Sequence, residues 1–348
     1  MTSPAKAEGS GPSIALDPEL DTNPGPSKGA KNLEGRSPGQ LMWQRFKRDR
    51  TGVVCACVVI FYFVIALAAP LLTKLSGTNP YTLYGQDPTY ADTPVLDEFG
   101  LPLGYFGGVS GTHWFGVEPQ LGRDVFAMLM YGMRTSLFMA VGVTVLLMVT
   151  GILIGLIGGY VGGRTDYWIG RVTDFFLSFP SQLFFIAFMP VVTAFFVDPQ
   201  EETPTYLRAV AMLIVLWVLG WMGMARLIRS TVLSLRDREF VEAAKVAGAS
   251  PWRIIRKEIL PNVVSPILVQ FTYQLPSTIL TIAFLSFAGV GFVEPTPDWG
   301  RLFAAGARYA EPDPSFMFFP GLALVIFILC FNLLGDSVRD AFDPKSGR

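Results

Sequence analysis

Residues 136–157 read SLFMAVGVTVLLMVTGILIGLI, a stretch of apolar and small residues that contains no charged side chain. The hydrocarbon core of a bilayer is about 30 Å thick, and a helix needs about 20 apolar residues to cross it. A helix also satisfies its backbone hydrogen bonds internally, which hydrocarbon requires. This stretch therefore predicts a transmembrane helix, and the rest of the chain can be interpreted outward from it.

Other stretches of similar length and hydropathy lie on both sides. Together with 136–157 they predict six spans, the others being 52–72, 175–197, 207–224, 263–292 and 316–334. Prolines interrupt the third span at positions 180 and 190 and the fifth at positions 266 and 276. The composition agrees, because 51% of the residues are hydrophobic, 16% are charged and the mean hydropathy is +0.43. The expected fold class is an all-α polytopic membrane protein with six transmembrane helices.

The distribution of Lys and Arg predicts how the spans are oriented. If the N-terminus is cytoplasmic, 17 of these residues fall in the other cytoplasmic segments and four more in residues 1–40, against six in the outer segments. Because basic loops resist translocation, we expect both termini and the 225–262 loop to be cytoplasmic. Residues 1–40 are rich in Gly, Pro and Ser and predict a disordered cytoplasmic tail before a membrane domain at 41–348. Acidic residues and prolines in this tail argue against a cleavable signal peptide, so the first span should be an uncleaved anchor.

Several function classes are excluded by composition and motifs. The formal net charge of -1 does not suggest a nucleic-acid partner. The glycine pairs lack the Lys-Ser/Thr ending of a phosphate-binding loop, and one His with three Cys inside apolar stretches predicts no metal site. We therefore expect no catalytic, cofactor-binding or metal-ligating residue in this chain. A structural, hydrogen-bonding role is favoured for His113, the single histidine.

The longest loop, residues 73–135, is rich in turn-forming residues and lacks the alternation of a sheet, so it predicts an extracytoplasmic cap. Residues 123–134 at its end are typical of a short amphipathic helix. In the second span, Gly151, Gly155 and Gly159 recur every four residues, which favours close packing against another helix. For Asp174, at the start of the third span, the expectation is snorkelling to the interface or packing.

A polar stripe runs along the fifth predicted span. Its members recur at helical spacing on an otherwise apolar helix, and they are Gln270, Tyr273, Gln274, Ser277, Thr278 and Thr281. Such a stripe should face protein or water instead of lipid. Hydrogen bonds to neighbouring helices and the lining of a solute pathway both explain it, and spacing does not decide between them.

The basic loop after the fourth span contains RDREFVEAAKVAGASPW at 236–252. Residues 238–246 favour a helix, Gly248 provides a C-terminal cap, and Ser250-Pro251 can start a second helix. The pattern predicts two short helices with a bend between them, in which small side chains leave the backbone accessible to a partner protein. From spacing alone, a plain pair of helices on the membrane surface explains the pattern equally well.

The same residues resemble a known signature. Glu242-Ala243-Ala244, Gly248 and Leu260-Pro261 are similar to the EAA motif of the membrane subunits of bacterial binding-protein-dependent ABC importers, which have the type I permease fold. One position departs from it, because Glu258 stands where the family has an apolar residue. Residues 113–137, 174–180 and 299–344 resemble the second, C-type permease subunit of dipeptide, oligopeptide and nickel importers. The resemblance covers about 40–345 and leaves out the tail and residues 75–112.

The resemblance implies a transport subunit that is not itself an enzyme. It implies a bacterial cytoplasmic (inner) membrane location, a homologous B-type permease subunit, and two ABC ATPase subunits that bind ATP and Mg. A solute-binding protein would dock on the outer face, at loops 75–134 and 293–315 with Trp299. Peptide would pass along a path through the protein, and membrane lipid would surround the protein. The implied ATPase-coupling residues lie in segment 236–261 and are Glu242, Ala243, Ala244, Gly248, Arg253, Arg256, Leu260 and Pro261.

The cargo and the class are the two points that remain open at this stage. Nickel, glutathione or haem would fit the same architecture, because the binding protein selects the cargo. A non-transport membrane scaffold that uses the two short helices only for docking is the alternative from another class.

Overall fold

A computed structural model describes residues 38–342 except 91, 93 and 199–202. In this part of the chain the regular structure is helical, and the β features are two isolated bridges, Leu96 with Pro102 and Val117 with Asp124. The all-α expectation is confirmed. Residues 1–37 of the predicted tail lie outside the described part of the chain. The last three residues of that tail, 38–40, already belong to helix α1 (Pro38–Arg48).

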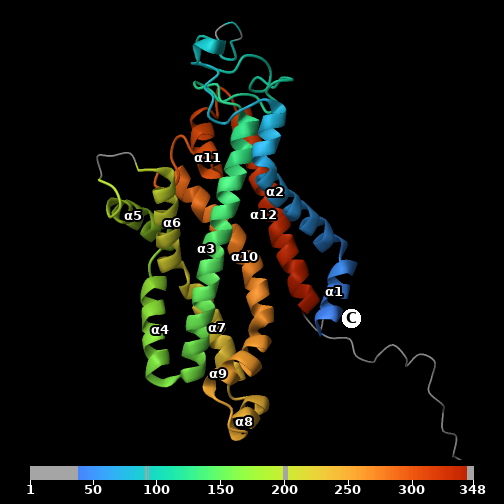
Figure 1. The fold of residues 1–348 in the computed structure, drawn as a ribbon, viewed down its shortest axis with the longest axis vertical. Coiled ribbons are helices and arrows are strands. Elements are labelled where there is room, and N and C mark those ends of the chain that lie inside the picture. Colours follow the sequence, from blue (N-terminus) through green and yellow to red (C-terminus); the bar gives the residue numbers. More distant parts are fainter. Residues whose placement is uncertain (1–37, 91, 93, 199–202, 343–348) are drawn as a thin grey trace, which may run out of the picture.

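Five helical stretches are long and apolar enough to cross a membrane. They are α2 (Arg50–Ser76), α3 (Val125–Val161), α6 with α7 (Thr205–Gly220 and Met222–Leu235), α9 with α10 (Pro251–Ile254 and Leu260–Phe287), and α12 (Ser315–Phe342). They contain the predicted first, second, fourth and sixth spans and most of the fifth. Figure 1 shows them as a long bundle in which α3 runs through the middle.

The predicted third span, 175–197, is not a single helix. Its residues are divided between α4 (Gly163–Leu177) and α5 (Ser181–Ala194), which are bent by 89° at the break. Pro180 lies in the break, and a proline disfavours the helical conformation for the residue before it. The second interrupting residue, Pro190, is accommodated inside α5. The count of six spans therefore holds only if this bent pair is counted as one.

Helix α3 extends further than expected at its beginning. The amphipathic helix predicted at 123–134 is not separate, since residues 125–134 are the first turns of α3. Asp124 caps this helix by accepting a hydrogen bond from the Ala127 N–H at 2.7 Å. Because the helix is uninterrupted from residue 125 to 161, α3 connects the two ends of the molecule directly.

The glycines of α3 allow close contact with α7. A Cβ atom at Gly155 would lie 2.8 Å from the Ile228 Cβ, and one at Gly159 would lie 2.7 Å from the Val232 Cβ. These separations are too short for real side-chain contacts, so glycine is required where the two backbones approach. The packing interpretation of the glycine row is confirmed.

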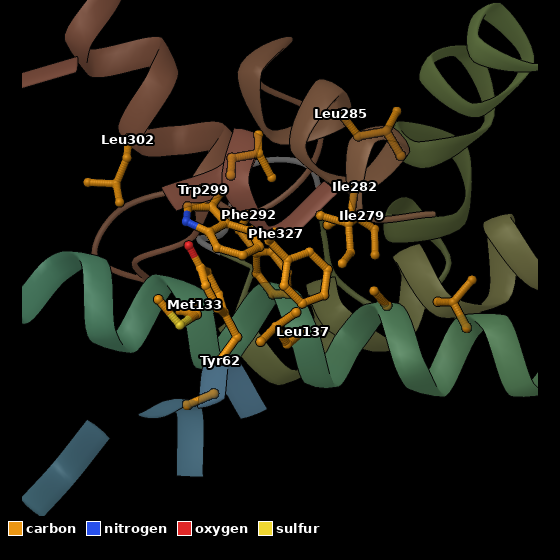
Figure 2. Packing of buried hydrophobic residues seen from close by; sticks show 14 of the residues in the cluster. Tyr62, Met133, Leu137, Ile279, Ile282, Leu285, Phe292, Trp299, Leu302 and Phe327 are labelled. Atoms are coloured by element: carbon orange, nitrogen blue, oxygen red, sulfur yellow. The ribbon is translucent and has the colours of Figure 1, made fainter. Parts of the chain in front are cut away.

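Two apolar clusters hold the bundle together. The larger one joins α2, α3, α10, α11 (Trp299–Arg308) and α12, with Trp299 and Phe327 at its centre (Figure 2). Here the Tyr62 hydroxyl donates to the Ala323 carbonyl at 2.8 Å, which satisfies a polar group inside the cluster. The second cluster lies near the other end, between α3, α7 and α10.

The two ends of the bundle differ in structure. One carries residues 77–124, here called the cap, whose described residues contain the two isolated bridges and the short 3₁₀ turn Pro88–Tyr90. The other carries α8 (Glu239–Val246) and α9, here called the elbow, which project beyond the bundle (Figure 1). Helix α3 runs from the cap to the elbow end.

Candidate coupling elbow and translocation face

The elbow has the bent geometry predicted from its sequence. Gly248 has φ +78° and follows α8, its N–H donates to the Lys245 carbonyl at 2.9 Å, and the Ala249 N–H donates to the Ala244 carbonyl at 3.0 Å. This pair of bonds is the Schellman motif, which ends a helix with a left-handed residue. The Ser250 side chain then accepts from the Arg253 N–H and caps α9. The expected C-cap and N-cap are therefore both confirmed.

Buried apolar side chains fix the elbow to the bundle. Val241 of α8 and Ile254 of α9 are buried in the second apolar cluster, which also contains Ile228 and Val232 of α7. The π-helical segment Ile255–Ile259 continues the chain into α10 without a loop. The elbow is thus packed against α7 and joined to α10, so a displacement of the elbow moves both helices.

The predicted coupling residues are mostly on the open side of this segment. Glu242, Ala243, Gly248, Arg253, Arg256 and Pro261 are exposed, and Ala244 and Leu260 are half-buried. A Cβ atom at Gly248 would meet no atom within 4 Å, so the left-handed turn faces open space. The structure brings these residues together on one end of the molecule. Glu258, the departure from the motif, is half-buried, and its carbonyl accepts from the Asn262 amide at 2.6 Å.

Two large apolar side chains of the elbow were missed by the sequence reasoning. Val246 is 90% exposed and Trp252 is 65% exposed. Exposed apolar residues of this size that cluster with polar neighbours mark interaction surfaces. The signal that could have found Trp252 was its place directly after the Ser250-Pro251 helix start, where it points away from the side that Ile254 buries.

The polar stripe of α10 divides between the two interpretations. The Tyr273 hydroxyl donates to Asp336 of α12 at 2.6 Å, which is a hydrogen bond between helices. Thr278 is buried and bonds the Gln274 carbonyl at 2.9 Å within α10. Ser277 is exposed, and Gln270, Gln274 and Thr281 are half-buried. Tyr273 and Thr278 thus serve the packing of the chain, whereas the centre of the stripe remains accessible.

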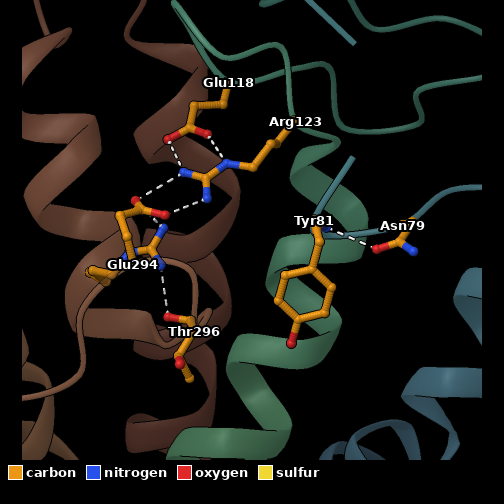
Figure 3. Close-up of polar contacts among 7 residues, drawn as sticks. Asn79, Tyr81, Glu118, Arg123, Glu294 and Thr296 are labelled. Atoms are coloured by element: carbon orange, nitrogen blue, oxygen red, sulfur yellow. Dashed lines mark hydrogen bonds and ion pairs between the residues drawn. The ribbon is translucent and has the colours of Figure 1, made fainter. Parts of the chain in front are cut away.

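A network of charges centred on the buried side chain of Arg123 lies under the cap (Figure 3). The Arg123 guanidinium pairs with Glu118 at 2.5 and 2.9 Å and with Glu294 at 2.6 and 3.1 Å. Arg301 of α11 contacts the same Glu294 at 2.6 Å and donates to the Thr296 carbonyl at 2.8 Å. The network therefore connects the cap to the segment between α10 and α11.

The charges of this network support one another. Burial works against the charge of Arg123, but its bonds to Glu118 and Glu294 outweigh this and raise its pKa. Burial alone would raise the pKa of Glu294, yet the bonds and charge of Arg123 and Arg301 leave this pKa below its ordinary value. Glu294 is therefore held in its charged form.

Two further carboxylates near the cap end begin helices. His113 Nδ1 lies 2.7 Å from Asp124, the residue that caps α3, so the structural role expected of this histidine is confirmed. Asp298 caps α11 by accepting from the Gly300 and Arg301 N–H groups, and burial raises its pKa to about 6. The next residue, Trp299, is fully buried and lies 6.0 Å from Phe327 between ring centroids. The expectation that Trp299 contributes to an outer docking surface is therefore wrong.

Two ion pairs connect α4 to α7 near the elbow end. Asp174 lies 2.5 Å from Arg226, and Asp166 pairs with Arg229, with a second bond of 2.7 Å. Asp174 thus contacts the neighbouring helix through a salt bridge, which agrees with packing, one of the two roles expected for it. Since α7 leads into the elbow, these pairs also connect α4 to it.

This helical bundle with its projecting elbow has the architecture of the membrane-spanning subunit of a transporter. The chain belongs to the family described as the binding-protein-dependent transport system inner membrane component, whose model matches residues 151–348. A second model, the N-terminal TM domain of oligopeptide transport permease C, matches residues 37–96. The chain is thus a multi-pass inner-membrane permease subunit of an ABC transporter.

Curated relatives agree over most of the chain. The dipeptide transport system permease protein DppC of Alkalihalophilus pseudofirmus is 34% identical, covering 89% of this chain and 90% of its own. The oligopeptide transport system permease protein OppC of Haemophilus influenzae is 34% identical, covering 90% of both chains. The glutathione transport system permease protein GsiD of Pectobacterium atrosepticum is 33% identical, covering 89% of this chain and 92% of its own.

A solved structure confirms the type of fold. The inward-facing MetNI methionine ABC transporter has a chain that matches with a TM-score of 0.50 and 19% identity. The match covers 62% of this chain and 96% of that one. The part of this chain without a counterpart amounts to more than a third, as expected for a permease with an added cap and N-terminal helix.

Proposed function

We propose that this chain is a transmembrane permease subunit of an ATP-driven importer that moves di- and oligopeptides across the bacterial cytoplasmic membrane. The elbow carries this proposal, since it presents Gly248 and Trp252 to a partner while Val241 and Ile254 fix it to the bundle. Its residues match the coupling motif recognised in the sequence. The relatives named as dipeptide and oligopeptide permeases support peptide as the cargo.

The family to which the chain belongs supports the proposed partners. Two ABC ATPase subunits would bind ATP and Mg and dock on the elbow, with Arg253 and Arg256 complementing acidic groups there. A homologous B-type permease would complete the path across the membrane. A solute-binding protein would deliver peptide at the cap end. In this arrangement both termini are cytoplasmic, in agreement with the Lys and Arg distribution.

The mechanism is mechanical coupling. Closure of the ATPases around ATP displaces the elbow, and the buried contacts of Val241 and Ile254 transmit this displacement to α7 and α10. Because α10 carries the polar stripe, its motion exposes Gln270, Gln274 and Ser277 alternately to each side of the membrane. Tyr273 keeps α10 attached to α12 through Asp336, so these two helices move together.

Uptake of labelled peptides tests the cargo. Cells that lack this chain are compared with cells in which it is restored, using peptides graded in length, with glutathione and radioactive nickel in parallel. We expect loss and rescue of peptide uptake. Rescue of glutathione or nickel uptake alone would replace peptide as the cargo and leave the architecture intact.

Dependence on an ATPase separates a transporter from a scaffold. A catalytically inactive variant of the partner ATPase should abolish the rescued uptake while the complex still assembles. If the chain supports its cellular role without any ATPase, the importer proposal is wrong and the docking scaffold is favoured.

A further inference from the structure

Helix α1 is an amphipathic element that the transport mechanism does not use. It is joined to α2 at Asp49, which caps α2 by accepting from the Thr51 N–H at 3.0 Å. The start of α2 packs tightly on the end of α12, since a Cβ atom at Gly52 would lie 2.7 Å from the Ser337 Cβ. Figure 1 shows α1 beside this C-terminal end of α12, on the side of the bundle that carries the elbow.

One side of α1 is aromatic and open. Trp43 is 54% exposed, and its ring is stacked on Phe46 with centroids 5.9 Å apart. The Lys47 ammonium lies 5.1 Å from the centroid of the Trp43 ring, which is a cation–π contact. An exposed tryptophan beside a lysine is unfavourable in water, but tryptophan is enriched where a membrane meets water.

The C-terminal end of α1 and its junction with α2 are basic. Four of the six residues 45–50 are Lys or Arg, all exposed, and Asp49 is the single acidic residue among them. A helix with a basic face and a Trp/Phe face lies in the plane of the membrane interface. Basic residues next to a span also attract the phosphates of anionic lipids.

We propose that α1 binds the surface of the anionic phospholipid leaflet at the elbow end of the protein. Trp43 and Phe46 enter the boundary between headgroups and acyl chains, and Lys47 and Arg48 contact lipid phosphates. A lipid surface fits better than a protein partner because α1 continues directly into α2, a helix apolar enough to span a membrane whose first turn exposes Val53 and Val54. Bound in this way, α1 fixes the level at which the first span enters the membrane.

The first test is the position of Trp43 in the full chain. The protein is reconstituted into phospholipid nanodiscs, and the emission of Trp43 is taken as the difference between the wild type and Trp43→Phe. We expect this emission to be quenched by phospholipid brominated high on the acyl chain and shielded from aqueous acrylamide. Quenching by acrylamide without quenching by the brominated lipid overturns the proposal.

The second test is the headgroup preference. Binding of phosphatidylglycerol to the purified full chain is measured by native mass spectrometry, with phosphatidylcholine as the neutral comparison. Lys47→Glu should weaken phosphatidylglycerol binding by about fivefold, the effect of one basic residue at an anionic surface. Lys257→Glu is the matched control, because Lys257 is an exposed lysine on the segment between the elbow and α10. An equal response of the two variants overturns the proposal.

Discussion

The charged groups at the two ends of the bundle are organised in opposite ways. At the cap end, Arg123 and Glu118 are buried, with side chains 3% and 5% exposed, and Arg123 makes bonds to two carboxylates. At the elbow end, Arg226 and Asp174 are 53% and 56% exposed and share a single contact. Both sets join segments distant in sequence, Arg123 to Glu294 and Arg226 to Asp174, but Arg123 is shielded from water whereas both members of the second pair are largely exposed.

This difference separates a part of the molecule built to stay fixed from a part able to move. Breaking a buried pair leaves a charge without water or partner, which is strongly destabilising, whereas an exposed pair contributes little and exchanges readily with water. The cap end therefore keeps one geometry as the transporter cycles. The elbow end can change its contacts at low cost, as coupling to an external motor requires.

The largest expected effect is at Arg123. Arg123→Met leaves Glu118 buried and unpaired and should lower the free energy of unfolding by about 3–5 kcal/mol. The measurement is thermal unfolding of the purified protein in detergent. The variant Glu118→Gln/Arg123→Met removes both charges and should recover most of the loss. Equal stability of Arg123→Met and wild type would show that the cap network does not fix this end.

The next effect is a dependence on pH at Asp298. Because burial raises its pKa to about 6, above the ordinary 3.8, the folded protein binds this proton more tightly than the unfolded chain. Its stabilising contribution is therefore present below pH 3.8 and is lost as the pH rises through about 6. Asp298→Asn keeps the helix cap without the charge, so it should be more stable than the wild type by about 2–3 kcal/mol at pH 7–8.

The stability contribution of Glu294 depends on pH in the direction opposite to that of Asp298. The lowered pKa of Glu294 contributes stability above pH 4.5, which is lost as the pH falls below that value. Unfolding temperatures of the wild type and Asp298→Asn, measured from pH 4 to 8, should differ most at pH 7–8 and approach each other only toward pH 4. A constant difference across this range would contradict the assigned role of Asp298.

The third expected effect is a loss of transport caused by a substitution at Gly248. Gly248→Glu places a charged side chain on the open side of the elbow and should reduce peptide uptake at least about tenfold, equivalent to about 1.4 kcal/mol. The protein should remain inserted and assembled, with ATP hydrolysis disconnected from transport. Normal uptake by this variant in intact cells would refute the coupling role of the elbow.

The chain offers matched controls for this variant. Gly289 has φ +80° and ends α10 with the same pair of hydrogen bonds, at 3.1 and 3.0 Å, and a Cβ atom there also meets no atom within 4 Å. Gly289→Glu therefore carries the same backbone strain far from the elbow. Gly248→Ala carries the strain without the charge, and both controls should retain peptide uptake.

Local signals were enough to predict some of this structure. The spans follow from hydropathy, and the elbow follows from Gly248 and Ser250-Pro251, because caps depend on residues only a few positions apart. Pro180 indicated the break in the third span, but not the 89° bend, which depends on how α4 packs against α7.

Features that depend on distant residues were not predicted. Arg123 and Glu294 are 171 positions apart, and the sequence reasoning counted Arg123 only as a charge on an outer loop. The family resemblance implied that Trp299 belongs to a docking loop, yet it fills the main apolar cluster against Phe327. The site roles of the elbow residues remain predictions, whereas their geometry is now defined.

The smallest expected effect concerns the exposed pair between α4 and α7. Asp174→Arg opposes Arg226 and should change stability by less than about 1 kcal/mol, because both side chains are largely in water. If α4 follows the elbow through this pair, peptide uptake should still fall by about two- to fivefold, and Asp174→Arg/Arg226→Asp should restore it. Uptake by the swapped variant as low as that of Asp174→Arg would mean that the positions matter for another reason than their pairing. Recovery would show that the Asp174–Arg226 contact, although it contributes little to stability, makes α4 move together with the elbow.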